Sequence, residues 1–244
     1  MMNSYVAVDL ETTGLNPKTD KIMEIGAIKV VDGQVAEEFH TMVHPRRQLE
    51  EEIVELTGIG DEMLRDAPGI EEIIGQVVAF CEGFPLVGHR IMFDYSFLKR
   101  AAVNAGLEFE KEGVDTLELC RKFMPEEERK NLGAACRYFR VETGTAHRAL
   151  SDAQAASGLY QELMRHHGKD RPEAFEPKTL IYKVKKEQPA TKRQKEGLRE
   201  LLKYHRIDIA VQIDHLSRNE VSRMTDKIIS KYGRIVKRLS LIHI

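Results

Sequence analysis

The sequence predicts an α/β fold, in which helices flank a mixed β-sheet, followed by a small C-terminal helical module. The first observation is a pair of β-rich runs separated by Asp32-Gly33, a dipeptide that strongly favours a two-residue hairpin turn. The second is that apolar strand patterns then alternate with helical patterns, as in sheets covered by helices. The third is charge: residues 178–244 carry 17 Lys and Arg against 7 Asp and Glu, whereas residues 1–177 carry 20 against 32. Parts of opposite net charge suggest two roles.

The first part begins with the apolar run YVAVDLE, and the hairpin candidate IMEIGAIKVVDGQVAEEFHTMV follows it. In residues 69–83 the apolar side chains recur at helical spacing, and Gly83 is placed to end that helix. A short apolar strand, FPLVGH, precedes the next expected helix, over residues 94–106. Further helical patterns occupy residues 116–124, 131–139 and 149–168.

The C-terminal part starts with residues 168–190, where three prolines and a lysine cluster predict a linker or a strap over the surface. Two helices follow, and each opens with a capping box, in which a hydroxyl and an N3 side chain satisfy free amides reciprocally. The boxes are Thr191 with Gln194 and Ser217 with Glu220. We therefore expect a small basic helical module over residues 191–238.

The last six residues, LSLIHI, fit no element of the predicted fold. They match one reading frame of a transposase mosaic end used in sequencing libraries. We therefore expect residues 239–244 to be a non-native tail that replaces the true C-terminus.

Composition bounds the class of protein. A chain of 244 residues with 42% hydrophobic content can bury one sizeable core and a smaller appendage. Its longest apolar runs fall short of a membrane span, and its first residues lack the pattern of a signal peptide. The three cysteines, an odd number without metal-binding spacing, predict reduced thiols and a cytoplasmic protein.

Two carboxylates, Asp9 and Glu11, stand at the end of the first apolar strand. Residues two apart on a strand point to the same face, so the two like charges favour a cation between them. Oxygen ligands without Cys or clustered His favour Mg²⁺ or Mn²⁺ over zinc. The alternative is that these acids mark where the strand enters a solvated turn.

Two further stretches strengthen the metal interpretation. GHRIMFDYSFL places Asp94 at the start of a helix after an apolar strand, and HRALSDA places His147 just before a helix and Asp152 in its first turns. Taken alone, each residue has an ordinary interpretation as a helix cap, a first-turn acid or a surface histidine. Together, four acids and a histidine at the edges of regular elements indicate one site.

The stretches DLETTGL, GHRIMFDYSFL and HRALSDA, in this order, resemble the three exonuclease motifs of the DEDDh family. This family of 3′–5′ exonucleases includes the proofreading subunit of bacterial DNA polymerase III. The connecting segments are similar too, and the resemblance covers about residues 4–166. It implies a ribonuclease H-like fold with a five-stranded mixed sheet, in a domain that we expect to span residues 1–167.

The resemblance also implies a role for each motif residue. Asp9, Glu11 and Asp152 would hold two divalent ions, Mg²⁺ or Mn²⁺, and Asp94 would complete the second site through water. His147 would deprotonate the attacking water, since imidazole is a common general base at neutral pH. The predicted substrate-binding residues are Thr12, Thr13, Gly14, Leu15, His89 and Phe93. Thr12 would meet the terminal 3′-hydroxyl and Leu15 would wedge against the last bases, although Leu15 also suits an ordinary loop residue docked on the core.

One residue departs from the family pattern. Family members commonly have Asn after the Gly-His pair, where this chain has Arg90. A guanidinium at that position adds a fixed positive charge with bidentate phosphate-binding geometry. We expect Arg90 to affect the preference for the terminal nucleotide and to leave the metal ligands unchanged.

The sequence thus predicts a metal-dependent 3′–5′ exonuclease that releases nucleoside 5′-monophosphates from single-stranded or frayed 3′ ends, with DNA preferred, in proofreading or repair. An RNA exonuclease that resembles ribonuclease T or oligoribonuclease is the alternative, since only pocket contacts to the 2′-hydroxyl separate the two. A non-catalytic subunit that binds a DNA polymerase is a third interpretation. The basic module either adds salt-sensitive affinity for phosphates or packs against a protein partner.

Overall fold

The computed structural model describes residues 2–209 and 211–235, and its contacts divide the chain into two units. The sheet unit comprises Met1–Pro45 and Leu49–Lys186. The helical unit comprises Arg46–Gln48 and Glu187–Ile244. Each unit has a hydrophobic core of its own, and each is described here by itself.

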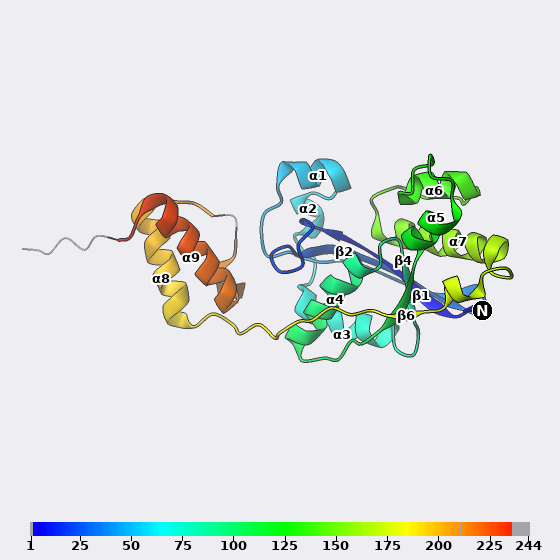
Figure 1. Ribbon diagram of the computed structural model, residues 1–244. Coiled ribbons are helices and arrows are strands. Elements are labelled where there is room, and N and C mark those ends of the chain that lie inside the picture. Colours follow the sequence, from blue (N-terminus) through cyan, green and yellow to red (C-terminus); the bar gives the residue numbers. More distant parts are fainter. Residues whose placement is uncertain (1, 210, 236–244) are drawn as a thin grey trace, which may run out of the picture. The chain divides into compact units, whose positions relative to one another are not determined.

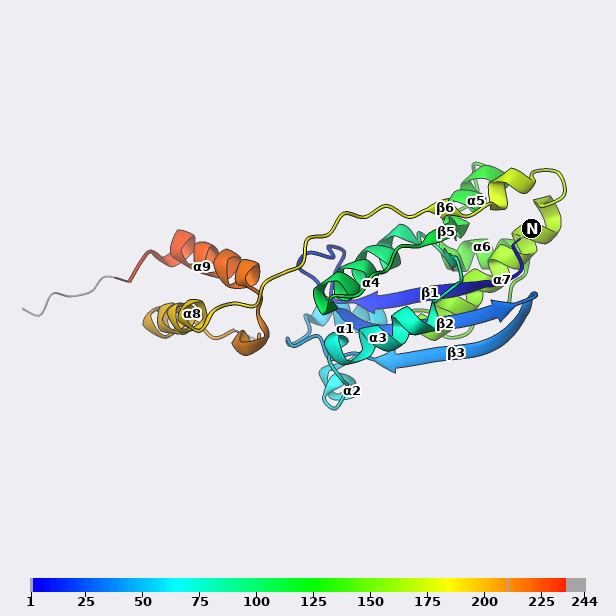
Figure 2. The same ribbon diagram turned by 90° about the horizontal axis from the view of Figure 1, so that it is seen from below.

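The sheet unit is built on a mixed sheet with strand order β3-β2-β1-β4-β5-β6. β1, β2 and β3 are antiparallel neighbours and lie side by side in Figure 2, whereas β1, β4 and β5 run parallel. The hairpin between β2 and β3 turns at Asp32 and Gly33, which both have positive φ, as the sequence predicts. The strands are β1 (Tyr5–Thr12), β2 (Ile22–Val31), β3 (Gln34–Met42), β4 (Leu86–Gly88), β5 (Glu112–Asp115) and β6 (Lys178–Thr179).

Helices cover both faces of this sheet, and Figure 1 shows α3 and α4 grouped apart from α5, α6 and α7. Predicted helices correspond to α3, α4, α5, α6 and α7, whereas the short α1 and α2 were not predicted. The bounds are α1 (Glu51–Thr57), α2 (Asp61–Leu64), α3 (Ile70–Phe80), α4 (Met92–Ala105), α5 (Thr116–Phe123), α6 (Leu132–Phe139), α7 (Ala149–His167) and a 3₁₀ turn at Pro172–Phe175.

The alternation of side chains along β1 decides which face receives the acids. Val6, Val8 and Leu10 belong to the core that α3 and α4 cover. Tyr5 and Ala7 belong to the opposite core, with residues of α7. Because side chains two apart share a face, Asp9 and Glu11 continue the row of Tyr5 and Ala7 towards α7.

Among the described residues the sheet has six strands, one more than the five expected. The added strand is β6, which lies in the segment predicted as a linker and pairs antiparallel with β5 through Gly113 and Lys178. Leu180, which follows β6, is buried, and its N–H donates to the Lys111 carbonyl at 2.9 Å. A two-residue strand followed by one buried leucine is too short to produce a readable hydrophobic period, and this is why the sequence did not reveal it.

The helical unit contains α8 (Lys192–His205), a 3₁₀ turn at Ile213–His215 and α9 (Arg218–Tyr232). Figure 1 shows α8 and α9 side by side, and leucines of α8 form a buried cluster with Val221 and Ile228 of α9. Both predicted capping boxes are present. The local signals of this part therefore correspond to real helix starts.

The expected non-native tail, residues 239–244, lies outside the described residues, as do the last three residues of the predicted module. In the described part of the chain, no helix is both long and apolar enough to cross a membrane.

Candidate active site

Asp9 and Glu11 lie half-buried near the end of β1, on the face that α7 covers. Their partners on β2 are Gly26, which is opposite Asp9, and Glu24, which is opposite Glu11. This placement agrees with the prediction that the two carboxylates project side by side from one strand. It also puts a third carboxylate, Glu24, on the same face.

Asp94 reaches the site from the first turn of α4. Its side chain is buried, and its Oδ1 accepts a hydrogen bond of 3.1 Å from the Leu10 backbone N–H. Leu10 stands between the two β1 acids, so this bond ties α4 to the strand at the site. Burial raises the pKa of Asp94 well above its ordinary value, and Asp115 and Glu11 add repulsion.

His147 and Asp152 arrive together at the start of α7. The His147 backbone has φ of 59°, a left-handed conformation that costs energy in a residue other than glycine. Its N–H donates to Asp152 Oδ2 at 3.0 Å, so the acid supports the turn that carries the histidine. The His147 side chain is exposed, whereas Asp152 is half-buried.

The structure brings Glu11, His147 and Asp152 into one cluster, with one ligand atom of each within 4.8 Å of the others. Two segments far apart in the sequence, the end of β1 and the start of α7, therefore meet at this cluster. The carboxylate oxygens of Glu11 and Asp152 at this separation fit a divalent cation such as Mg²⁺ or Mn²⁺, and the His147 imidazole lies beside them.

The acids of the site repel one another. Burial, followed by the charges of Asp94 and Asp152, raises the pKa of Asp9 well above its ordinary value. Burial and the neighbouring Asp152 raise the pKa of Glu11 to about 7, and burial raises that of Asp152. Carboxylates crowded in this way are stabilised by a cation, which is a second reason why the donor set fits a metal.

Sequence reasoning missed Glu24, Arg148 and Gly26. Glu24 Oε1 accepts from Arg148 Nη2 at 3.0 Å and lies 2.6 Å from His40 Nε2, and Oε2 accepts from the Ala149 N–H at 3.2 Å. Burial alone would raise the pKa of Glu24, but these hydrogen bonds hold it below its ordinary value, so the carboxylate is ionised at neutral pH. The available signal was an acid inside the apolar run IMEIGAI, the same signal that revealed Asp9.

Gly26 allows the start of α7 to approach the sheet. A Cβ added to Gly26 would lie 2.1 Å from the Leu150 nitrogen and 2.2 Å from the Ala149 carbonyl carbon. Real Cβ atoms do not approach backbone so closely, so only glycine fits beneath this helix. The residue opposite Asp9 is thus what permits α7 to bring Asp152 over β1.

The predicted substrate-binding turn follows β1 directly. Thr12 Oγ1 donates to the Gly14 carbonyl at 2.7 Å, and Thr13 Oγ1 accepts from the Lys21 N–H at 3.0 Å. A Cβ on Gly14 would lie 2.5 Å from an Asp20 carboxylate oxygen. Leu15 is 77% exposed, so it is not docked on the core and is available to a ligand.

His89 and Phe93, the other predicted substrate-binding residues, flank the start of α4. Both ring nitrogens of His89 are already engaged, with Thr116 Oγ1 at 3.0 Å and the Lys130 carbonyl at 2.8 Å. Phe93 is half-buried and packs against Phe97. The structure therefore gives His89 a structural role between β4 and the segment before α6.

Arg90 is exposed and has φ of 76°, and its N–H donates to Asp115 Oδ1 at 2.9 Å. The left-handed conformation explains why asparagine suits this position better than most residues. Arg90 adopts it in the turn between β4 and α4, four residues before Asp94.

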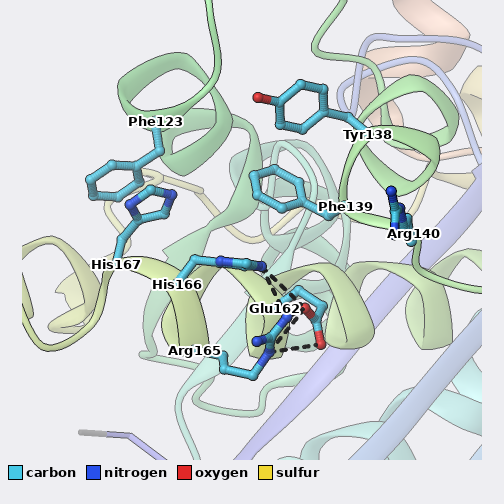
Figure 3. Close-up of a pocket in the computed structure, with 8 residues that line it drawn as sticks. All are labelled: Phe123, Tyr138, Phe139, Arg140, Glu162, Arg165, His166 and His167. Carbon is cyan, nitrogen blue, oxygen red and sulfur yellow. Dashed lines mark hydrogen bonds and ion pairs between the residues drawn. The ribbon is translucent and has the colours of Figure 1, made fainter.

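A pocket of about 640 Å³ lies near the C-terminal end of α7 and is separate from the predicted site residues (Figure 3). Its rings are paired, with Phe123 stacked on His167 at a centroid distance of 4.3 Å. Its Arg165 is bound to Glu162 at 2.5 Å. The residues that line it are Phe123, Tyr138, Phe139, Arg140, Glu162, Arg165, His166 and His167.

Comparisons with known proteins agree with the fold and the motifs. Residues 6–160 match the RNase_T family, whose description is Exonuclease. DNA polymerase III PolC-type of Caldanaerobacter subterraneus subsp. tengcongensis is 37% identical over 160 residues, which cover 66% of this chain and 11% of that protein. The PolC-type polymerase of Bacillus subtilis is 38% identical over 165 residues, with the same coverage. The chain thus spans about a tenth of the length of these curated relatives.

Solved structures show the same fold. Exonuclease X in complex with 5′ overhanging duplex DNA has a TM-score of 0.55 and 25% identity, and covers 67% of this chain and 93% of its own. E. coli Exonuclease I in complex with a dT13 oligonucleotide has a TM-score of 0.59 and 16% identity, with 70% and 42% covered. The second likeness concerns the fold alone.

The ribonuclease H-like sheet and its three motifs define a domain of the DEDDh exonuclease class. This chain belongs to the RNase_T exonuclease family, and its sheet unit is homologous to a region of PolC-type DNA polymerase III.

Proposed function

We propose that this chain is a metal-dependent 3′–5′ exonuclease that hydrolyses DNA to nucleoside 5′-monophosphates, in cytoplasmic proofreading or repair. The observation that carries the proposal is the convergence of Glu11, His147 and Asp152 from two distant segments, beside Asp9 and Asp94. A purely structural role leaves crowded acids with raised pKa values unexplained. DNA is preferred over RNA because the curated relatives are DNA polymerases and Exonuclease X was solved with DNA.

Each side chain has a task in this mechanism. Asp9, Glu11 and Asp152 would hold two divalent ions, and Asp94 would support the second ion through water. Two such ions, when bound, stabilise charge on the attacking and leaving oxygens of a phosphodiester. His147, whose exposed imidazole faces Glu11 and Asp152, accepts the proton of the attacking water.

The turn after β1 would receive the 3′ end. Thr12 and Gly14 form a compact turn beside the acids, and the exposed Leu15 offers an apolar side chain to the last bases. Phe93 supplies a partly buried ring on α4. For His89 we propose indirect support only, because its ring nitrogens are already engaged.

The test is digestion of a 5′-labelled single-stranded DNA oligonucleotide with Mg²⁺, with EDTA, and by Asp9→Ala protein. A ladder that shortens from the 3′ end, and that both controls abolish, is the expected result. Glu112→Gln is the matched variant, since this strand carboxylate of the same sheet is exposed and should digest like wild type.

An RNA oligonucleotide of the same sequence is digested in parallel. Faster digestion of RNA would overturn the preference for DNA and leave the metal mechanism standing. Intact DNA and RNA under all conditions would overturn the proposal and favour a non-catalytic subunit that binds a polymerase.

We propose in addition that the basic helical unit binds phosphates. Its support is the excess of Lys and Arg over Asp and Glu, 13 against 7 in residues 187–244, and side chains such as Lys192 are exposed. Because β6 and Leu180 belong to the sheet unit, the proper truncation ends at Lys186. Loss of affinity for single-stranded DNA and a shallower dependence on salt are expected. An unchanged salt dependence would instead favour a protein partner.

A further inference from the structure

We propose that Glu24 is a positioning residue that holds His147 in place for proton transfer, an inference that rests on the function proposed above. The carboxylate of Glu24 is 1% exposed and belongs to β2, whereas two of its partners, Arg148 and Ala149, belong to the start of α7. The hydrogen bonds of this carboxylate come from the protein, because its oxygens accept from Arg148, Ala149 and His40.

Glu24 contacts the two residues that follow His147 in the sequence. Arg148 follows His147 directly, and its Nε and Nη2 both donate to Glu24. Ala149 is the first residue of α7, so its N–H is one of the groups that a helix leaves without a partner inside itself. Glu24, on β2, accepts a hydrogen bond from this N–H. It thereby fixes both residues that follow the histidine.

His147 needs such support because its own backbone is in the left-handed region. This conformation persists only where surrounding contacts determine it. Asp152 holds the His147 N–H from one side, and the pair of Glu24 and Arg148 holds the next residue from the other. An imidazole on a turn fixed at both ends is held in one place, as a general base requires.

Glu24 is a poor candidate for a metal ligand in its own right. Its two oxygens already accept from a guanidinium, a backbone amide and an imidazole. The cluster of residues with ligand geometry contains Glu11, His147 and Asp152. The geometry therefore assigns Glu24 to the support of His147.

The experiment compares Glu24→Gln and Arg148→Gln with Glu37→Gln. Glu37 on β3 is the matched control, since it forms an ion pair of 3.0 Å with Lys29 on the neighbouring strand but is exposed. We expect the kcat for single-stranded DNA to fall about 10–100-fold in the first two variants, with KM unchanged, and to stay at the wild-type value in Glu37→Gln. Arg148 is partly exposed, so its variant tests the same contact if Glu24→Gln does not fold.

A double-mutant cycle separates positioning from general damage. If Glu24 acts through His147, Glu24→Gln should cost little activity in the His147→Ala background. An equal loss in both backgrounds would overturn the proposal. So would a loss of Mn²⁺ affinity, measured by calorimetry, that accounts for the fall in kcat.

A third readout does not depend on nuclease activity. The amide hydrogens of His147 and Ala149 should exchange faster in Glu24→Gln than in wild type, while those of α4 are unchanged. If the wild-type protein digests neither DNA nor RNA, the proposed function fails and this measurement still tests the contact. Unchanged exchange at both amides would overturn the role of Glu24 itself.

Discussion

The helices α7 and α8 begin in two different ways. α8 is capped by its own neighbours, because Thr191 accepts from the Gln194 N–H and Gln194 accepts from the Thr191 N–H. Among the described residues, the N-cap residue of α7, Arg148, makes no side-chain cap. The first N–H of α7 instead donates to Glu24, which is 125 residues away in the sequence. The same physical need is met locally in one helix and by tertiary structure in the other.

The difference reflects what each helix start has to do. The acid in the first turns of α7, Asp152, holds the His147 N–H and faces the site, so it is already engaged. A cap for α7 must then come from another element, and β2 provides it. In α8 the first turn has no such second task, and a local capping box suffices.

The largest expected effect comes from breaking the tertiary arrangement at Gly26. Gly26→Ala should destabilise the protein by about 1–3 kcal/mol, because its Cβ would overlap the backbone of Ala149 and Leu150. Displacement of α7 should also lower nuclease activity about 10²-fold, since His147 and Asp152 move with it. Urea unfolding and oligonucleotide digestion measure the two effects. Gly26→Ala protein with normal stability and activity would show that α7 can shift without harm.

This contrast explains how far the sequence could predict the molecule. The apolar run of β1, the turn at Asp32 and Gly33, and both capping boxes are local signals, and the structure contains all of them. The motifs likewise placed Asp94 in the first turn of α4. Glu24 and Gly26 escaped prediction because their roles exist only after distant segments meet, and β6 because two residues give no readable hydrophobic period.

The next prediction concerns the acids of the site without metal. The pKa of Glu11 rises from 4.5 to about 7 in the folded protein. Between these values the folded state keeps a proton that the unfolded chain has released, so raising the pH lowers the free energy of unfolding. In EDTA, stability should therefore fall from pH 4.5 to about 7, and Mg²⁺ should restore part of it at the upper end.

Glu11→Gln isolates this effect, since other acids also contribute to the pH dependence. The difference in stability between Glu11→Gln and wild type in EDTA should grow in favour of the variant as the pH rises. In the helical unit a carboxyl pKa shifts in the opposite direction, because Arg199 holds the pKa of the exposed Asp214 below its ordinary value. A stability difference between Glu11→Gln and wild type that stays constant from pH 4.5 to 7 would contradict the prediction.

A smaller effect is expected where the cap is local. Thr191→Ala removes the hydroxyl of the capping box and should destabilise α8 by about 1 kcal/mol. Amide exchange of α8 residues should accelerate accordingly, with the amides of α7 as an internal reference. Protection of α8 at the wild-type level would mean that this box contributes nothing.

The smallest expected effect is a stabilisation, and it too comes from replacing a glycine by alanine. A Cβ added to Gly197 in α8 meets nothing within 4 Å in the described part of the chain, so Gly197→Ala should stabilise this helix by about 0.5–1 kcal/mol. Gly75→Ala in α3, where the space is equally open, should behave alike in the sheet unit. Slower amide exchange in both helices is the expected measurement. A glycine can be replaced where only helix propensity acts on it, whereas Gly26 is required because another segment lies against it. Destabilisation by Gly197→Ala would show that α8, too, depends on a contact from outside the helix.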